Sequence, residues 1–324
     1  DGFEITKEIN KKLKKRFCSI SSKPFKFKNI IMHFGSQYMW NDWYKHLSKD
    51  NRYIVNFYHG KYEDGTDVKK HIDLFLRSVP HIKYILTAST IVKNRLISWN
   101  VPSEKIVLIP IGVNTKIFRP VSLKNKNRLR KKIGILEDEF VIGSFQKDGI
   151  GWQEGFKPKL IKGPDLFVEV LKILSKRIKI KVMLTGPARG FVKNQLRLNN
   201  ISYSHVYLDS QENICDYYKV LDLYLITSRE EGGPKGIVEG LSSGIPVAST
   251  NVGMARDIIR NYKNGILLNS FEPKLIAEQI LKFIRLKKKP NIEEMRKSIY
   301  KADWKIVAEN HFNKMYKPLR DLKS

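Results

Sequence analysis

Short apolar runs alternate with segments of helical periodicity along most of this 324-residue chain. Runs rich in branched and aromatic residues predict buried strands. Between them, apolar residues recur three or four positions apart, which predicts amphipathic helices. The predicted strands cover residues 27–34, 53–58, 83–87, 105–109, 140–145, 179–184, 205–208, 223–226, 245–248 and 266–268. Because strands and helices alternate, we expect an α/β fold whose parallel sheets carry helices on both faces.

The predicted helices lie between these strands and at both ends of the chain. They cover residues 3–17, 38–47, 67–77, 90–99, 166–174, 214–220, 237–241, 255–260, 273–285, 291–300 and 304–319. In the first of them, Ile5, Ile9, Leu13 and Phe17 are four residues apart with lysines between them. Such a basic amphipathic helix either packs on the protein core or lies on a membrane surface.

A charged segment, RPVSLKNKNRLRKK over residues 119–132, has the composition of a linker that can continue into a first helix of the second domain, ending at Gly134. It divides the chain into an N-terminal domain over residues 1–118 and a second domain over residues 119–303. The last stretch, residues 304–324, is expected to form a C-terminal helix that packs back on the first domain. The predicted architecture is therefore two Rossmann-like domains with a cleft between them.

The most informative stretch is LYLITSREEGGPKGIVEGLSSGIPVAST, residues 223–250. It predicts a buried strand, a glycine-rich loop, a helix stopped by Gly244, and another strand. A helix that begins at a glycine-rich loop offers unpaired N–H groups to an anion. Glu231 before the loop and Glu239 about two turns later in the helix can face one ligand. A diphosphate between two sets of hydroxyls, as in a nucleotide-sugar, suits this arrangement.

Two further residues stand where ligands bind in α/β folds. His59 follows the predicted strand 53–58, at the carboxyl end where such sheets bind ligands. Lys162 precedes Gly163 and Pro164 at the start of a helix, where its ammonium can neutralise a phosphate that the helix N-terminus attracts. An ordinary structural histidine and a solvated surface lysine are the alternatives.

The net charge of +28 admits three interpretations: binding to nucleic acid, proximity to an anionic membrane, or a lysine-rich composition without a binding role. No nucleic-acid motif is present, which makes a nucleic-acid partner the least favoured of the three. No apolar run approaches the roughly 18 residues of a membrane helix. Cys18 and Cys215 are too few for a zinc site or a disulfide framework, and fit unpaired thiols in a reducing cytoplasm.

Taken together, these motifs resemble the retaining glycosyltransferases of family 4, the glycosyl transferases group 1, which have the GT-B fold. The resemblance is carried by S-x-x-E-G-G-P-K-G-I-V-E-G-L-S-S-G-I-P-V, with its Glu-x7-Glu pair Glu231 and Glu239. Residues 85–120 are similar to the end of that family's first domain, and 252–268 to the tail of its donor domain.

The resemblance implies a hexosyltransferase-type enzyme (EC 2.4) that moves sugar from a nucleotide-sugar to a glycan or lipid-linked acceptor with retained configuration. Glu231 binds a sugar hydroxyl, Glu239 holds the ribose hydroxyls, Lys162 stabilises the departing diphosphate, and His59 lies near the sugar. His59, Lys162 and Glu231 are the expected catalytic residues. The expected donor-binding residues are Lys147, Lys162, Glu231, Gly232, Gly233, Pro234, Lys235, Gly236 and Glu239.

A UDP- or GDP-linked sugar is the expected co-substrate, with no cofactor and no metal, because no Asp-x-Asp motif ends a strand. The expected location is cytoplasmic, with an anionic inner membrane face as a possible surface partner. Retention is expected to proceed by a front-face mechanism in which the leaving phosphate assists the acceptor.

Two features depart from the family pattern. Ser144-Phe145-Gln146-Lys147 stands where an arginine is usual, and the first domain looks shortened, with His33-Phe34-Gly35-Ser36 in place of its glycine-rich loop. Two alternatives therefore stay open: a non-catalytic relative that binds nucleotide-sugar or glycan, and a nucleotide-sugar epimerase on the same fold.

Overall fold

The computed structural model describes residues 2–23, 26–36, 42, 44–208, 213–287 and 290–321. Its contacts divide the chain into two compact units. The first comprises residues 1–112, 231–233 and 301–324, and the second comprises residues 113–230 and 234–300. Each unit holds one parallel sheet, as expected for a two-domain α/β fold.

The first unit is built on a four-stranded sheet in the order β1-β2-β3-β4. All three strand pairings are parallel. The strands are β1 (Ile31–Gly35), β2 (Arg52–Asn56), β3 (Tyr84–Thr87) and β4 (Ile106–Leu108). The helices of this unit are α1 (Gly2–Leu13), α2 (Thr66–Ser78), α3 (Thr90–Ser98), α12 (Trp304–His311) and α13 (Lys317–Asp321), with a π-helical segment at Phe312–Tyr316.

Alternate residues of these strands pack into two separate layers, which is why their sequences read as continuous apolar runs. Val55 and Ile85 face one core, formed with α2 and α3. Ile54 and Leu86 face the other, formed with α1 and the C-terminal helices.

The apolar stripe of α1 faces this second core. Ile9 is fully buried, and Ile5, Leu13 and Phe17 pack around it. The helix ends at Leu13 rather than at the predicted residue 17, because Lys14 adopts a left-handed conformation (φ 51°). The stripe is thus part of the protein interior and does not form a surface for lipid.

The second unit contains a six-stranded sheet in the order β10-β9-β8-β5-β6-β7, with every pairing parallel. Its strands are β5 (Phe140–Ser144), β6 (Ile180–Thr185), β7 (Tyr203–Val206), β8 (Leu223–Ile226), β9 (Val247–Thr250) and β10 (Gly265–Leu268). Its helices are α4 (Leu123–Lys132), α5 (Pro164–Ser175), α6 (Gly190–Leu198), α7 (Ile214–Tyr218), α8 (Lys235–Ser242), α9 (Ala255–Ile258), α10 (Pro273–Ile284) and α11 (Ile292–Ser298).

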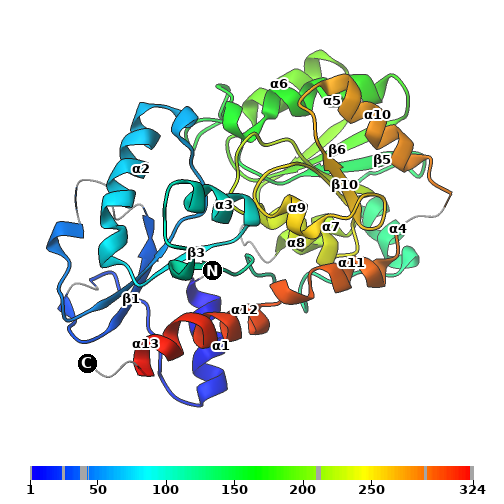
Figure 1. Ribbon diagram of the computed structural model, residues 1–324. Coiled ribbons are helices and arrows are strands. Elements are labelled where there is room, and N and C mark those ends of the chain that lie inside the picture. Colours follow the sequence, from blue (N-terminus) through cyan, green and yellow to red (C-terminus); the bar gives the residue numbers. More distant parts are fainter. Residues whose placement is uncertain are drawn as a thin grey trace. The chain divides into compact units, whose positions relative to one another are not determined.

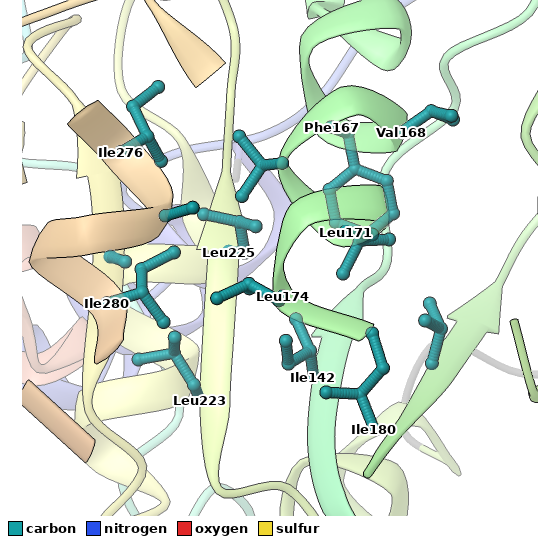
Figure 2. Close-up of a cluster of buried hydrophobic side chains, with 14 of the residues drawn as sticks. Ile142, Phe167, Val168, Leu171, Leu174, Ile180, Leu223, Leu225, Ile276 and Ile280 are labelled. Atoms are coloured by element: carbon teal, nitrogen blue, oxygen red, sulfur yellow. The ribbon is translucent and has the colours of Figure 1, made fainter. Parts of the chain in front are cut away.

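Helices cover both faces of this second sheet (Figure 1). On one face, α5 and α10 lie together and bury Leu223 and Leu225 of β8 (Figure 2). The residue between them, Tyr224, points to the opposite face, where its ring meets Gly236 of α8. Both sides of β8 are therefore buried, which accounts for its uninterrupted apolar sequence.

Several element boundaries differ from the sequence predictions. β7 covers residues 203–206 rather than 205–208, and α6 over 190–198 was not predicted. The segment 119–132 continues from Leu123 onward into a helix, as expected. This helix, α4, is anchored by Lys126 and Arg130 on Asp222. Half of the predicted helix 38–47 lies outside the described residues, and residues 44–46 form a 3-10 turn.

A buried ion pair holds the carboxyl ends of β5 and β6. The guanidinium of Arg189 lies 3.0 Å from the carboxylate of Asp148, and both side chains are almost completely buried. Arg189 also donates hydrogen bonds to the carbonyls of Ser144 (2.7 Å) and Gln146 (2.6 Å). One side chain thus fixes the course of the chain as it leaves β5.

Replacing Arg189 by Met should lower the free energy of unfolding by about 3–5 kcal/mol, because it leaves the Asp148 carboxylate buried without its counter-charge. Urea denaturation followed by circular dichroism measures the change. Arg229→Met is the control, because its ion pair with Asp165 is over a third exposed and should contribute about 1 kcal/mol or less. Equal losses in the two variants would contradict the assignment of Arg189 as the anchor.

Two buried histidines should make stability depend on pH. Burial lowers the pKa of His33 to about 4, with a further contribution from nearby His311, and burial lowers the pKa of His311 to about 4 as well. In neutral His33, Nδ1 lies 2.7 Å from the Tyr316 hydroxyl and Nε2 lies 2.6 Å from Asn56 Oδ1, so both ring nitrogens are satisfied without a second proton.

Because the unfolded state takes up protons first, stability should be constant above about pH 6.5 and fall between about pH 6.5 and 4, by up to roughly 3 kcal/mol per histidine. Urea midpoints measured across this pH range check the slope. His33→Gln combined with His311→Gln should reduce the slope to the part contributed by His71 and His205, whose pKa values burial also lowers. His46→Gln, at an exposed site, should leave the slope unchanged. A slope as steep in the double variant as in the wild type would refute this origin.

Candidate active site

The loop between β8 and α8 is shaped by close backbone packing. Gly236, in the first turn of α8, faces the Tyr224 ring, and a Cβ there would lie 2.2 Å from the ring edge. Gly244 ends the segment after α8 with φ 76°, a conformation that favours glycine. The predicted arrangement of strand, glycine-rich loop, helix and strand is observed, with α8 beginning at Lys235 rather than at residue 237.

The turn that carries Lys162 is joined directly to this loop. Lys162 ends a short 3-10 helix (Leu160–Lys162), and Gly163 follows with φ 64°. A Cβ on Gly163 would lie 1.9 Å from the carbonyl oxygen of Thr227. The Thr227 hydroxyl donates to the Gly163 carbonyl at 2.8 Å. Only glycine fits at this contact, which brings the half-buried Lys162 beside the β8–α8 loop.

Further hydrogen bonds fix the same two segments. Arg229 Nη1 and Nη2 donate to the two carboxylate oxygens of Asp165, in the first turn of α5, at 2.8 and 2.6 Å. The Arg229 backbone N–H donates to the carbonyl of Ile161 at 2.9 Å. The start of α5 and the start of the β8–α8 loop therefore form one ordered edge of the sheet.

Glu239 is the acidic residue of α8, and one of its carboxylate oxygens already accepts a hydrogen bond within the protein. The hydroxyl of Tyr218 donates to Glu239 Oε2 at 2.8 Å. Burial raises the pKa of the Glu239 carboxyl, and the hydrogen bond from Tyr218 opposes that shift. Burial also raises the pKa of Tyr218 well above its usual value, so the phenol stays protonated and acts as donor. Because the bond occupies Oε2, Oε1 is the oxygen left to accept from a ligand hydroxyl.

Tyr218 itself is held by aromatic neighbours. Its ring lies 4.8 Å from that of Phe145 and 5.1 Å from that of Tyr224, measured between ring centroids. The Phe145 N–H donates to the Tyr224 hydroxyl at 3.1 Å. This cluster links the residue after β5 with β8 and gives Glu239 a fixed partner. The sequence does not single out Tyr218, which looks like any buried aromatic residue of a helix.

The remaining loop residues, Glu231 to Gly233, belong by their contacts to the first unit. A Cβ on Gly232 would lie 2.4 Å from the carbonyl oxygen of Tyr58, and one on Gly233 would lie 2.8 Å from the Ile111 side chain. Glu231 is half-buried. The two glycines are thus required by close packing, a reason that the sequence did not reveal.

His59 is exposed and follows β2 and two further residues, near the carboxyl end of the first sheet as predicted. Its charge contributes to the lowered pKa of His71, for which burial is the larger cause. Gly60 adopts φ 112°, and its carbonyl accepts from Arg95 at 2.8 Å, so the backbone beside His59 is fixed.

Lys147, expected to replace the usual arginine, lies in the second unit with its ammonium 3.6 Å above the centre of the Trp152 ring. Arg189 of the same unit is committed to the buried pair with Asp148. Sequence reasoning missed Arg189, because one arginine among 60 basic residues carries no distinguishing signal.

Across the described part of the chain, no three His, Cys, Asp or Glu side chains are grouped so that they could hold a metal ion. No helix within these residues is both long and apolar enough to cross a membrane.

The comparisons with known proteins point to one family. Residues 156–302 match the family described as glycosyl transferases group 1. An uncharacterized glycosyltransferase of Methanocaldococcus jannaschii is 26% identical over 205 residues, which cover 61% of this chain and 52% of that protein. The chain spans about half the length of the curated relatives it matches.

Solved structures of similar fold support the two-domain α/β architecture. A glycosyltransferase from Rickettsia africae superposes with a TM-score of 0.69 at 19% identity, covering 100% of this chain and 83% of that one. Anabaena HepE, in complex with UDP and glucose, gives a TM-score of 0.68 at 17% identity, covering 84% of this chain and 72% of that one. The predicted fold of two Rossmann-like domains is confirmed, and over residues 156–302 the chain is similar to the glycosyl transferases of group 1.

Proposed function

We propose that this chain is a retaining glycosyltransferase whose second unit binds a nucleotide-sugar. The observation that carries the proposal is the edge formed by the Lys162 turn, the β8–α8 loop and Glu239. It offers positive charge and helix N–H groups for a diphosphate, beside a carboxylate oriented for hydroxyls. The similarity to glycosyl transferases of group 1 covers these residues.

Each residue has a distinct part in this proposal. Glu239 Oε1 accepts from a ribose hydroxyl while Tyr218 holds Oε2. Lys162 and the N-terminus of α8 stabilise the negative charge that develops on the departing diphosphate, and Lys147 adds to that charge. Glu231 and His59 bind hydroxyls of the transferred sugar. Backbone N–H groups of Gly232, Gly233 and Gly236, together with Pro234 and Lys235, line the donor.

The donor class follows from the same chemistry. A UDP- or GDP-linked sugar has the diphosphate and ribose that this edge is suited to hold, and HepE, of similar fold, was solved with UDP and glucose. We propose that lysines and the N-terminus of α8 stabilise the negative charge of the diphosphate without a metal ion or cofactor. Retention then proceeds on the front face, because Glu231 is engaged in holding the donor sugar.

The proposed acceptor is a glycan or a lipid-linked sugar with acidic groups, in keeping with a net charge of +28. We place the enzyme in the cytoplasm, peripheral to the inner face of a membrane. A non-catalytic binder would share the donor edge, so the tests below separate binding from chemistry.

Glu231→Ala should abolish sugar transfer while leaving UDP or GDP affinity within about threefold, because the residue is proposed to hold the sugar and not the nucleotide.

A thermal-shift panel of nucleotide-sugars identifies the donor first, since a tight ligand stabilises the fold. Release of nucleotide from that donor then reports catalysis with and without acceptor. Glu230→Ala, at the neighbouring position, is the control for chain disruption. Full activity in Glu231→Ala would refute the site; donor binding without turnover in the wild type would favour the binder.

Tyr218→Phe should weaken nucleotide binding about fivefold to tenfold, the effect of one lost hydrogen bond to a carboxylate. Removal of that bond also raises the pKa of Glu239 further, so binding should begin to fail at a higher pH than in the wild type as pH falls. Titrations of nucleotide at several pH values measure both effects. Tyr217→Phe, at the adjacent half-buried tyrosine, should change neither; an unaltered pH profile in Tyr218→Phe would show that the contact is merely structural.

A further inference from the structure

The chain between β5 and α5 exposes several large apolar side chains. We call residues 149–160 the aromatic loop. Trp152 is 79% exposed, Phe156 68%, Leu160 56% and Ile150 51%. These side chains lie within twelve positions of one another, whereas single exposed apolar residues are ordinary on protein surfaces. Such a concentration marks an interaction site.

The aromatic loop is held in shape by its own backbone. Gly149 and Pro158 form an antiparallel bridge, and the Ile150 N–H donates to the Lys157 carbonyl at 2.9 Å. Farther along, the Phe191 N–H of α6 donates to the Gly155 carbonyl at 3.1 Å. Gly155 lies so close to Ala188 that a Cβ would come within 2.6 Å of it. The buried base of the loop therefore presents the apolar side chains to solvent in an ordered arrangement.

The charge on and beside the loop is positive. Lys157 and Lys159, on the loop itself, are exposed. The one acidic residue of the loop, Glu154, is paired with Lys193 of α6 at 2.9 Å. A surface that combines exposed Trp and Phe with lysines fits the interface of an anionic membrane, where aromatic rings sit at headgroup level and ammonium groups meet phosphates.

We propose that the aromatic loop docks this chain on an anionic lipid surface. Trp152 and Phe156 enter the headgroup region, and Lys157 and Lys159 contact lipid phosphates. The stripe of α1, the membrane contact considered from the sequence, packs on the core instead. The purpose of docking rests on the proposed function, since a lipid-linked acceptor resides at that surface, but lipid binding itself requires no catalysis.

Sedimentation with vesicles tests the proposal on the full chain. Equimolar phosphatidylcholine and phosphatidylglycerol vesicles should bind the protein, and pure phosphatidylcholine vesicles should bind it far less. Trp152→Ser combined with Phe156→Ser should reduce partitioning into the anionic vesicles at least about tenfold, because the apolar contribution is lost. Lys157→Glu combined with Lys159→Glu should reduce it by a similar factor and remove most of the salt dependence.

Matched controls lie elsewhere in the same unit. Leu198→Ser with Phe271→Ser removes apolar side chains that are 68% and 52% exposed, and Lys176→Glu with Lys274→Glu reverses the charge of two exposed lysines. Both controls should retain more of the vesicle binding than the corresponding loop variant. Unchanged urea midpoints would show that all four variants fold.

Three results would overturn the proposal: no binding to anionic vesicles by the wild type, loop variants that bind as tightly as the wild type, or equal losses in loop and control variants. If the wild type does not bind vesicles, the loop could instead join two copies of the chain, which would also overturn the proposal. Sedimentation velocity would then show dimers of the wild type that are lost in Trp152→Ser with Phe156→Ser. Absence of transferase activity in a wild-type chain that binds anionic vesicles would count against the proposed function alone.

Discussion

The fold of the second unit depends on one buried charge, the guanidinium of Arg189. A buried guanidinium is tolerated only where a carboxylate and several carbonyl oxygens surround it, and Arg189 has both in Asp148 and the backbone at the end of β5. Where the chain leaves β5, this constraint sets the path of Phe145, Gln146 and Lys147. The aromatic support of Glu239 and the base of the aromatic loop both begin there. One ion pair thus underlies two features with different proposed roles.

The proposed donor edge shows how a fixed backbone prepares a site for a charged ligand. Gly163 and Thr227 meet so closely that neither loop can move without the other, and Arg229 ties the same loops again through Asp165. Groups held in this way need no reorganisation when a diphosphate binds or leaves, which is the condition under which electrostatic stabilisation is strongest. The hydrogen bond from Tyr218 extends the same principle to Glu239, whose carboxylate is already oriented.

The parts of this protein that could be predicted from its sequence are those in which local pattern and environment agree. β8 was predicted with its observed bounds because a strand buried on both faces must be apolar at every position. The residues of the motif around Glu231 and Glu239 were likewise recognisable, because a glycine-rich loop followed by a helical pattern marks a helix start. Tyr218, Arg189 and the contact between Gly163 and Thr227 could not be predicted, since each depends on residues distant in sequence that meet only in the folded sheet. α6 was missed because its buried face is limited to a few residues such as Val192 and Leu196.

The same long-range contacts carry a consequence for folding. Arg189 and Ser144 are 45 residues apart, and Thr227 and Gly163, like Arg229 and Asp165, are 64 apart. Contacts that close such long loops form late, because the entropy of closure must be overcome before they contribute. The donor edge should therefore be complete only once β5, β6 and β8 have paired. During refolding, recovery of nucleotide binding would report completion of the second unit rather than its nucleation.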